Sequence, residues 1–206
     1  MEKEYHLPDA QLLKDNYSSS GILVWVPELF CIVLGQSNKP GESINIEQVK
    51  KDNIPVYKRP SGGEAVILSP NTLVISFLKR DEALRSPKRY FGIYNEIIIK
   101  ALHSLGVKGL AQNGISDVCL RDKKVMGSSI YRNKDLLLYQ AVLNISESVL
   151  SLEKYLKHPP REPQYRNKRS HKNFVTSLTA QGYHLSAEKI KKSILSNIFL
   201  QSSSKK

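Results

Sequence analysis

The chain has 206 residues, of which 31 are Lys or Arg and 19 are Asp or Glu, so its formal net charge at pH 7 is +12. Its hydrophobic content of 40% is enough for a buried core and excludes a disordered chain. It contains neither an apolar run of the roughly 18 residues that a membrane helix needs nor a pair of cysteines spaced for a disulfide framework or a metal site. We therefore expect a cytoplasmic protein with an anionic partner and no membrane association.

Short strands separated by polar turns are predicted in the first part of the chain. A helix over 8–16 comes first, with Leu12 and Leu13 directed inward. A polar loop over 36–43 and a short helix over 44–52 interrupt the strands. The strands are rich in β-branched and aromatic residues and are predicted at 22–26, 30–34, 56–59, 64–68 and 73–78, the last two forming a hairpin around the turn residues Ser69-Pro70-Asn71.

The second part of the chain holds the clearest helix, over 90–105, whose apolar residues recur at helical spacing before Gly106. Further helices are predicted at 148–156 and 187–200, the latter with Ser186 as its N-cap. Because regular strand–helix alternation is missing, we predict an α+β fold with a mixed, largely antiparallel sheet flanked by helices. The remaining strands are predicted at 117–120, 125–131 and 136–144, the last of them apolar almost throughout and therefore buried.

The first candidate for chemistry is a glycine turn within 58–66, Lys-Arg-Pro-Ser-Gly-Gly-Glu-Ala-Val. Gly62 and Gly63 let the main chain approach a ligand closely and expose amide N–H groups. The guanidinium of Arg59 offers a fork of donors that suits a carboxylate or a phosphate. The same residues also fit a hairpin with exposed charges, and they form neither a Walker loop nor a GxGxxG loop.

The second candidate is the run 113–129, in which a tight turn at Asp122-Lys123 places Lys124 at the start of a strand. Gly127 in that strand leaves room for a ligand against the backbone. A lysine near a glycine turn could neutralise a phosphate or polarise a carboxyl group, although a surface hairpin with solvated lysines has the same pattern. Cys119 stands in no fixed relation to any histidine, so a cysteine nucleophile with a base is not indicated.

The third candidate is a basic loop over 158–173, which we call the basic segment. It is longer than most loops that only connect secondary-structure elements, and such long loops are often functional. It suits an acidic protein partner or RNA, or it is simply solvated. Its candidate docking residues are Arg161, Arg166 and Arg169.

Together, these segments resemble the lipoate–protein ligase family. The resemblance rests on 32–39 with 53–66 and 73–77, on 114–129 and on 157–174, in that order. The wider biotin/lipoate ligase and octanoyltransferase superfamily shares the first two parts. The resemblance implies one catalytic domain over 1–206 with a polar tail at 201–206 and no C-terminal accessory domain, so that a separate subunit would supply that domain where it is required.

The resemblance also implies a reaction. Lipoate or octanoate and ATP form an acyl-adenylate, with Mg²⁺ bridging the phosphates, and the acyl group passes to a lysine of apo lipoyl domains of 2-oxoacid dehydrogenases or of the glycine-cleavage carrier protein. Lys124 and Arg59 would be catalytic, and no direct protein ligand to the metal is expected. Val66, Ile75 and Phe77 would line a dry slot for the acyl tail. The adenylate and lipoyl group would be bound by Ser61, Gly62, Gly63, Glu64, Ala65, Val66, Ile67, Asp117, Gly127 and Ser128.

The sequence departs from the family pattern at three places. Glu64 replaces a third glycine, Ile67-Leu68 replaces Tyr-His, and Tyr139-Gln140 replaces His-Gly. Two other functions stay open. One is an ATP-independent octanoyl or lipoyl transferase that takes a carrier-bound acyl group onto a cysteine. The other is a basic RNA-binding module, although no RNP1-like aromatic pattern supports nucleic acid as the partner.

Overall fold

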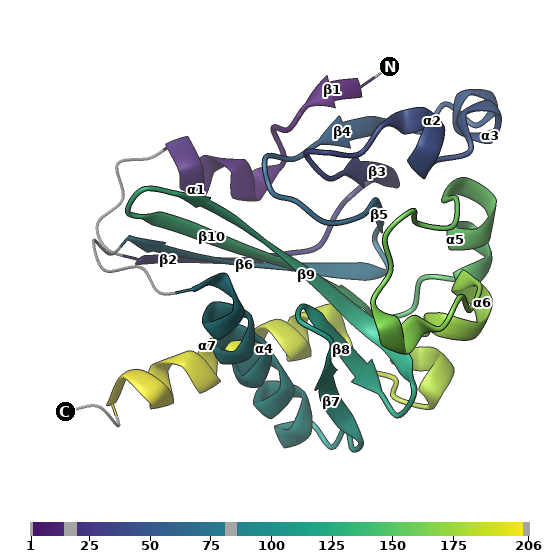
Figure 1. Ribbon diagram of the computed structural model, residues 1–206. Coiled ribbons are helices and arrows are strands. Elements are labelled where there is room, and N and C mark those ends of the chain that lie inside the picture. Colours follow the sequence, from purple (N-terminus) through teal and green to yellow (C-terminus); the bar gives the residue numbers. More distant parts are fainter. Residues whose placement is uncertain (1, 15–19, 81–85, 204–206) are drawn as a thin grey trace.

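The computed structural model describes residues 2–14, 20–80 and 86–203 and arranges them in layers. A smaller and a larger sheet lie one above the other, and two long helices cover the outer face of the larger one (Figure 1). The predicted α+β fold with flanking helices is confirmed, and its strands are divided between the two sheets. No helix in the described ranges is long and apolar enough to cross a membrane.

The larger sheet has six strands, each antiparallel to its neighbours, in the order β2-β6-β10-β9-β8-β7. Its central strands β6 and β10 are buried on both faces, which explains why their sequences are apolar almost throughout. The short strand β7 escaped prediction because it has no apolar run of its own. The strands are β2 (Ser20–Trp25), β6 (Thr72–Arg80), β7 (Leu110–Asn113), β8 (Asp117–Leu120), β9 (Lys123–Asn133) and β10 (Leu136–Asn144).

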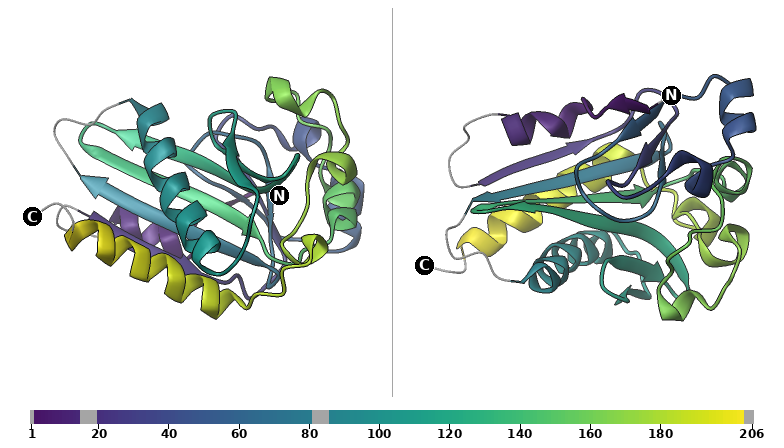
Figure 2. Two further views of the ribbon diagram at one scale, coloured as in Figure 1. Left: turned by 90° about the horizontal axis from the view of Figure 1, so that it is seen from below. Right: turned by 45° about the horizontal axis from the view of Figure 1, so that its top comes forward.

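Helices α4 (Pro87–Ser104) and α7 (Ala187–Ser203) pack on the outer face of this sheet (Figure 2). The Ser186 hydroxyl accepts a hydrogen bond from the Lys189 amide at 3.3 Å, which confirms the predicted N-cap. Helix α7 continues to Ser203, so the first part of the expected polar tail is helical. Apolar residues at helical spacing fill the main core, among them Ile98, Leu102, Ile190 and Ile194.

Ile75 and Phe77 belong to this same core and do not line a ligand slot. The Phe77 ring stacks on Tyr94 with 4.6 Å between centroids. Because side chains alternate along a strand, Val74 faces the opposite way, toward the smaller sheet. The prediction that Ile75 and Phe77 line the acyl slot is therefore wrong, and Val74 occupies that face of β6.

The smaller sheet has the order β1-β4-β3-β5, with β1 and β3 parallel to β4 and β5 antiparallel to β3. The predicted hairpin between 64–68 and 73–78 is wrong, because β5 pairs with β3 while β6 pairs with β2 and β10. The turn between them carries the chain from one sheet to the other, and Ser69 anchors it by donating to the Glu147 carboxylate at 2.5 Å. The strands are β1 (Glu2–Glu4), β3 (Cys31–Leu34), β4 (Val56–Lys58) and β5 (Val66–Leu68).

Short helices close the ends of the layers. The predicted N-terminal helix is a 3-10 turn followed by α1, and its last two residues lie outside the described ranges. The loop predicted at 36–43 contains α2, and the basic segment contains a 3-10 turn and the start of α6 rather than an irregular loop. These elements are α1 (Gln11–Lys14), α2 (Pro40–Ser43), α3 (Ile46–Lys51), α5 (Val149–Tyr155) and α6 (His171–Phe174), with 3-10 turns at Pro8–Ala10, Gln164–Arg166 and Thr179–Gln181.

Candidate active site

Two adjoining cavities open where the sheets and the basic segment meet. The first lies between the two sheets, has a volume of ≈ 720 Å³, and is called the sheet groove. The second lies under the basic segment, has a volume of ≈ 160 Å³, and is called the side slot. The two cavities share one wall, called the junction, formed by Glu64, Ala65, Val66, Asp117, Lys124, Gly127, Val142, Arg161 and Pro163. The glycine turn and the lysine strand, far apart in sequence, are thus brought together.

The sheet groove has apolar walls and a polar floor. Val74 and Val142 from the larger sheet face Val33 and Leu68 from the smaller one. Because strands of both sheets supply one face each, the walls are rigid and largely apolar. The floor includes the Tyr5 hydroxyl and the Gln140 amide.

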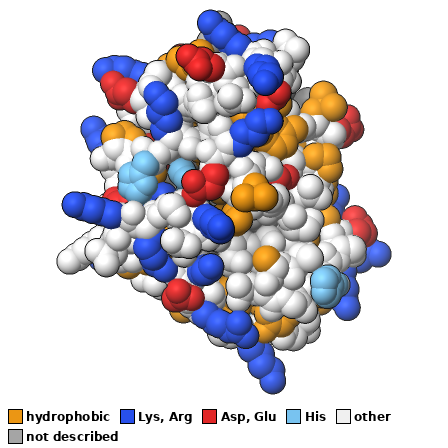
Figure 3. All heavy atoms as spheres, turned by 90° about the vertical axis from the view of Figure 1, so that its right-hand side faces the viewer, with side chains coloured by type: hydrophobic (Ala, Val, Ile, Leu, Met, Phe, Trp, Pro, Cys, Tyr) orange, Lys and Arg blue, Asp and Glu red, His pale blue; other side chains and the backbone are white. Residues whose placement is uncertain are grey.

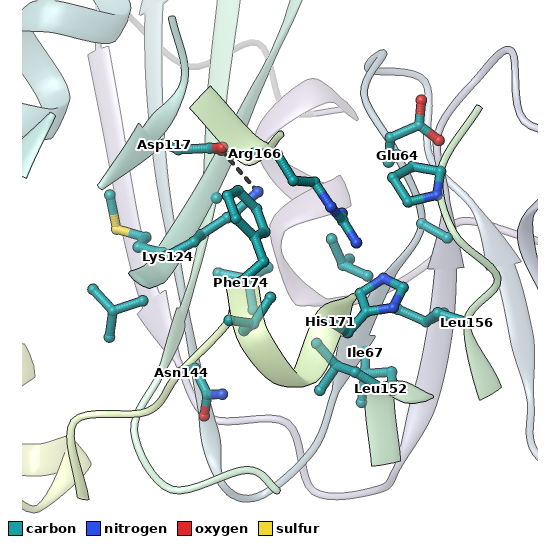
Figure 4. A pocket seen from close by; sticks show the side chains of 18 of the residues that line it. Glu64, Ile67, Asp117, Lys124, Asn144, Leu152, Leu156, Arg166, His171 and Phe174 are labelled. Atoms are coloured by element: carbon teal, nitrogen blue, oxygen red, sulfur yellow. Dashed lines mark ion pairs between the residues drawn. The ribbon is translucent and has the colours of Figure 1, made fainter. Parts of the chain in front are cut away.

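Lys124 stands at the junction. Its Nζ lies 2.8 Å from Asp117 Oδ1, and its side chain is 29% exposed (Figure 4). Asp117 Oδ2 accepts a hydrogen bond from the Tyr165 hydroxyl at 2.6 Å, so the basic segment fixes the carboxylate that fixes the lysine. A β-bulge at Val118/Cys119 accompanies this arrangement in the β8–β9 ladder.

Gly127 lies directly beside this lysine. A Cβ at this position would lie 2.8 Å from both Cε and Nζ of Lys124. The glycine therefore makes room for the ammonium group to fold back over its own strand. The space that we expected Gly127 to leave for a ligand is occupied, at the position of a Cβ, by the end of the Lys124 side chain.

Arg59 lies behind the glycine turn and is only 6% exposed. Its Nε donates to Ser61 Oγ at 3.0 Å, and its Nη1 donates to the Val33 carbonyl at 3.2 Å. Its Nη2 donates to the carbonyls of Gly62 at 2.7 Å and Glu64 at 3.0 Å. Burial lowers the pKa of Arg59 to about 10, so the group stays charged at neutral pH. The side chain lines the sheet groove, and its donors hold the turn in shape.

The two glycines of the turn have different roles. Gly63 has φ 88°, a conformation that favours glycine, whereas a Cβ at Gly62 would meet no atom within 4 Å. A Cβ at Gly35, in the neighbouring turn, would overlap the Gly63 carbonyl. The close approach of the two main chains thus requires glycine at position 35, whereas Gly63 is favoured by its positive φ. Gly63 lines the sheet groove, and Gly62 lines neither cavity.

The other predicted ligand-binding residues divide between the cavities. Five of them lie at the junction: Glu64, Ala65, Val66, Asp117 and Gly127. Ser128 lines only the sheet groove and Ile67 only the side slot. Ser61 lines neither, because its buried hydroxyl contacts Ser129 at 3.0 Å and donates to Gln140 Oε1 at 2.9 Å. The Glu64 carboxylate accepts a hydrogen bond from Asn38 at 3.2 Å.

The polar floor of the groove was missed from the sequence. Asp9 is fully buried and accepts hydrogen bonds from Tyr5 at 2.7 Å and Gln140 at 2.6 Å. It also accepts one from the Ser76 hydroxyl at 2.9 Å. A lone glutamine within an apolar strand was the available signal, since a buried amide requires partners. This network ties the N-terminal turn to the larger sheet beneath the groove.

The three arginines of the basic segment have separate positions. Arg161 is exposed at the rim of both cavities. Arg169 lies over the Phe174 ring at 5.2 Å and donates to the Tyr165 carbonyl at 3.1 Å. Arg166 is only 5% exposed and points into the side slot (Figure 4). A single docking surface formed by all three is therefore not what the fold presents.

His171 shares the side slot with Arg166. The pKa of His171 is lowered to about 4, mainly because the ring is buried and secondly because the charge of Arg166 is nearby. The ring is therefore neutral at pH 7. Sequence spacing gave no sign of this histidine, whose position depends on the packing of α6 against the segment before it.

Neither cysteine of the chain lines either cavity. Burial raises the pKa of Cys31 to about 11. Burial also raises the pKa of Cys119, whose Sγ lies 3.7 Å from the Tyr165 hydroxyl. A raised pKa and a position outside the cavities both disfavour a thiolate nucleophile.

The end of the molecule that carries α5 and α6 is predominantly basic (Figure 3). Its exposed basic side chains include Lys154, Lys157, Arg161, Lys168 and Lys172. Two of them, Lys157 and Arg161, line the cavities, so a polyanionic or acidic ligand would meet a favourable field there.

Comparison with known proteins agrees with this geometry. A family model described as the lipoyl protein ligase A/B catalytic domain matches residues 9–199. A curated protein of Aeropyrum pernix named "Putative lipoate-protein ligase A" is 35% identical over 103 residues, which are 48% of this chain and 36% of that protein. The aligned region thus spans about a third of the length of that relative.

Solved structures show the same fold. The bi-partite lipoate protein ligase of Thermoplasma acidophilum, studied with its E2 lipoyl domain, superposes with a TM-score of 0.78 at 20% identity, over 92% of this chain and 74% of that one. A lipoate-protein ligase A bound with ATP superposes with a TM-score of 0.75 at 18% identity, over 96% of this chain and 81% of that one.

Proposed function

Because this chain belongs to the lipoyl protein ligase A/B catalytic domain family, we propose that it activates lipoate or octanoate with ATP and transfers the acyl group to a lysine of a lipoyl carrier domain. The observation that carries this proposal is the meeting of two cavities of different character at Lys124. A bimolecular reaction between a fatty acid and a nucleotide needs such a pair of sites with one shared charged wall.

The sheet groove suits the acyl chain. Its walls bring Val33, Val74 and Val142 around a channel that ends at the junction. Burial of apolar chain in such a channel contributes about 0.8 kcal/mol per methylene group. The carboxylate would then stand beside Lys124, at the opening toward the side slot.

The side slot suits the nucleotide. It combines apolar walls from Leu152, Leu156 and Phe174 with cationic groups at its entrance. A carboxylate that attacks an α-phosphate meets like-charge repulsion, which a fixed cation at the junction reduces. A single well-placed donor to developing charge is worth about 3 kcal/mol in the barrier. The position of Lys124 at the junction supports that role for it, and Arg59, which lines the sheet groove, would add its buried charge.

The described residues contain no group of three or more His, Cys, Asp or Glu side chains that could hold a metal ion. We expect Mg²⁺ to enter bound to the phosphates of the nucleotide, which usually supply most of its ligands in such sites. Its charge would add to that of Lys124 at the junction.

Transfer of the acyl group needs an acceptor at the open side of the junction. We propose apo lipoyl domains of 2-oxoacid dehydrogenases, or the glycine-cleavage carrier protein, in the cytoplasm. The basic end of the molecule favours an acidic carrier domain over RNA as its partner, and Arg161 stands at the rim of both cavities. The Thermoplasma ligase is bi-partite and was studied with its E2 lipoyl domain, which supports a separate accessory subunit and this class of acceptor.

The position of the cysteines distinguishes this proposal from an ATP-independent transferase. That mechanism requires a thiolate in contact with the acyl group, and Cys31 and Cys119 lie outside both cavities. We therefore propose that activation uses ATP and no acyl-enzyme. Replacement of both cysteines by alanine is expected to change the activity less than threefold.

Two measurements test the proposal. The first is the intact mass of an apo lipoyl domain after incubation with the protein, ATP, Mg²⁺ and lipoate or octanoate. The second is calorimetric binding of a non-hydrolysable lipoyl-adenylate analogue, which needs no accessory subunit. Lys124→Ala is expected to lower lipoate-dependent ATP–pyrophosphate exchange by 100- to 1,000-fold, whereas the neighbouring Lys123→Ala is expected to leave it unchanged. Failure of the wild-type protein to bind the analogue would refute the proposal.

A further inference from the structure

Arg166 presents a buried cationic donor without a partner. Its side chain is 5% exposed, and its Nη2 atom has no hydrogen-bond partner among the residues that the structure describes. The side chain extends into the side slot from the 3-10 turn of the basic segment (Figure 4). A buried charged donor without an acceptor is costly, and native structures rarely retain one without a ligand or a bound water.

The remainder of the guanidinium is fixed. Its Nε donates to the Arg169 carbonyl at 3.0 Å and lies 3.4 Å from Glu162 Oε2. Its plane lies over the Phe174 ring, with 4.8 Å between Cζ and the centroid. Because these contacts set the position of the group, the free Nη2 has a defined direction into the slot.

A second orphan group points to the same cavity. Ser43 Oγ is buried, lines the side slot and has no hydrogen-bond partner within the described part of the chain. The acidic side chain Glu147, also in the wall, is already engaged by Ser151 at 2.7 Å and by the Ser148 amide at 3.1 Å. Glu64 and Asp117 also line the slot, and Arg166 Nη2 forms no hydrogen bond with any of these three carboxylates.

We infer that Arg166 is a phosphate-binding residue, which donates through Nη2 to a phosphoryl oxygen of the nucleotide in the side slot. This inference rests on the proposed function. Arg166 lines only the side slot, whereas an acyl carboxylate arriving through the sheet groove reaches the junction at Lys124. A planar guanidinium matches phosphate geometry and makes short, charge-assisted bonds.

Arg169 provides a matched control. The two arginines exchange hydrogen bonds between their side chains and main chains, with Arg169 Nε donating to the Arg166 carbonyl at 3.1 Å. Both lie over the Phe174 ring, but only Arg166 lines a cavity. Loss of Arg169 removes a similar packing contact without removing the donor in the slot.

The test is calorimetric binding of ATP, AMP, adenosine and inorganic pyrophosphate to the full chain and its variants. Arg166→Met is expected to weaken ATP binding 10- to 100-fold and to leave adenosine binding within twofold. Arg169→Met is expected to leave ATP binding within threefold. Arg166→Lys keeps the charge without the fork of donors and is expected to give intermediate ATP affinity.

Each outcome is informative. Unchanged ATP binding in Arg166→Met or in Arg166→Lys, with a wild-type protein that binds ATP, would overturn the inference and leave the proposed function intact. An equal loss of ATP and adenosine binding would also overturn it, because it would show a structural role. A wild-type protein that binds none of these ligands would refute the proposed function itself. Should Arg166→Met fail to fold, the comparison of Arg166→Lys with wild type still decides.

Discussion

The two sides of the junction each contain a buried arginine, and the two differ in what they bind. Arg59, behind the glycine turn, donates from all three of its nitrogens. Arg166, under the basic segment, is equally buried but leaves one nitrogen without a partner in the described structure. Burial alone would assign both to the same role. The hydrogen bonds separate an arginine whose donors are all satisfied by the fold from one that keeps a free donor, which we propose binds a ligand.

The comparison extends to the walls that these arginines belong to. The glycine-turn wall is saturated, since Arg59 satisfies the Gly62 and Glu64 carbonyls and Ser61 is bonded to Gln140. Arg166 lines the side slot and leaves Nη2 without a partner in the described structure, while Lys124, at the junction, is paired with Asp117. The glycine turn is thus held by its own hydrogen bonds, whereas the side slot contains an unpaired cationic donor.

Arg59→Met gives the largest effect expected from this comparison. It leaves several buried carbonyl and hydroxyl groups without donors, so we expect the free energy of unfolding to fall by about 3–5 kcal/mol. Urea denaturation followed by circular dichroism measures it. Lys39→Met is the control, because Lys39 forms an exposed ion pair with Glu42 at 3.2 Å, and such pairs contribute less than about 1 kcal/mol. A loss below 1 kcal/mol for Arg59→Met would contradict a holding role.

Much of the fold was predictable because the spacing of apolar residues in the sequence matches the buried faces of the helices and strands. Helix α4 and strand β10 follow from the spacing of their apolar residues, and the Ser186 cap follows from its side chain. The glycine turn and Lys124 were also recognisable, since their residue types suit anionic ligands. Their convergence on the sheet groove required the resemblance, because no local rule brings 59 and 124 together.

The rest depended on partners distant in sequence. The chain passes from one sheet to the other at a turn that is anchored by the hydrogen bond from Ser69 to Glu147, a contact across 78 positions. The roles of Arg59 and Arg166 depend on the Val33 carbonyl and the Phe174 ring, which no spacing rule connects to them. The polar floor under Gln140 likewise needs Asp9 from the N-terminal turn.

Gly127→Ala is expected to lower activity and to leave stability nearly unchanged, whereas Arg59→Met is expected to lower stability. The new Cβ displaces the flexible end of Lys124, which can move at little cost to folding. A displacement of about 1 Å in a positioned group can cost up to about 100-fold in rate, so we expect a 10- to 100-fold lower rate of acyl-adenylate formation with less than about 1 kcal/mol of lost stability. Gly62→Ala is the matched control, since its Cβ would meet open space. Equal activity in the two variants would remove Lys124 from the reacting position.

Acid should destabilise the protein through His171 in the basic segment. The pKa of His171 is lowered to about 4 in the folded chain, whereas an unfolded histidine titrates near about 6.5. Between these values the unfolded chain binds a proton that the folded chain does not bind, so stability falls as pH decreases through this window, by about 3 kcal/mol. The groups that act on the ring are Arg166, Glu153, His158 and Lys124.

His171→Gln should remove this part of the pH dependence, as measured by urea denaturation at pH 4.5, 5.5 and 7. NMR titration of the ring in Arg166→Met should show a higher pKa than in the wild type, because a neighbouring cation is lost. An unchanged pH profile in His171→Gln would show that other groups cause the acid sensitivity.

The smallest effect is expected at the rim of the cavities, where Arg161 is exposed and not buried like Arg59 and Arg166. Arg161 is exposed beside the junction, so Arg161→Gln is expected to slow acyl transfer to an acidic lipoyl domain about twofold to fivefold at low salt and not at 0.5 M salt, where the Debye length is only about 4 Å. The rate of acyl transfer is measured by mixing preformed acyl-adenylate with the lipoyl domain and quenching the reaction at set times. Lys192→Gln on α7, on the outer face of the larger sheet, is the control for net charge. A salt-independent loss in Arg161→Gln would place Arg161 with Arg166, in contact with the ligand, rather than with the surface charges that guide the acceptor.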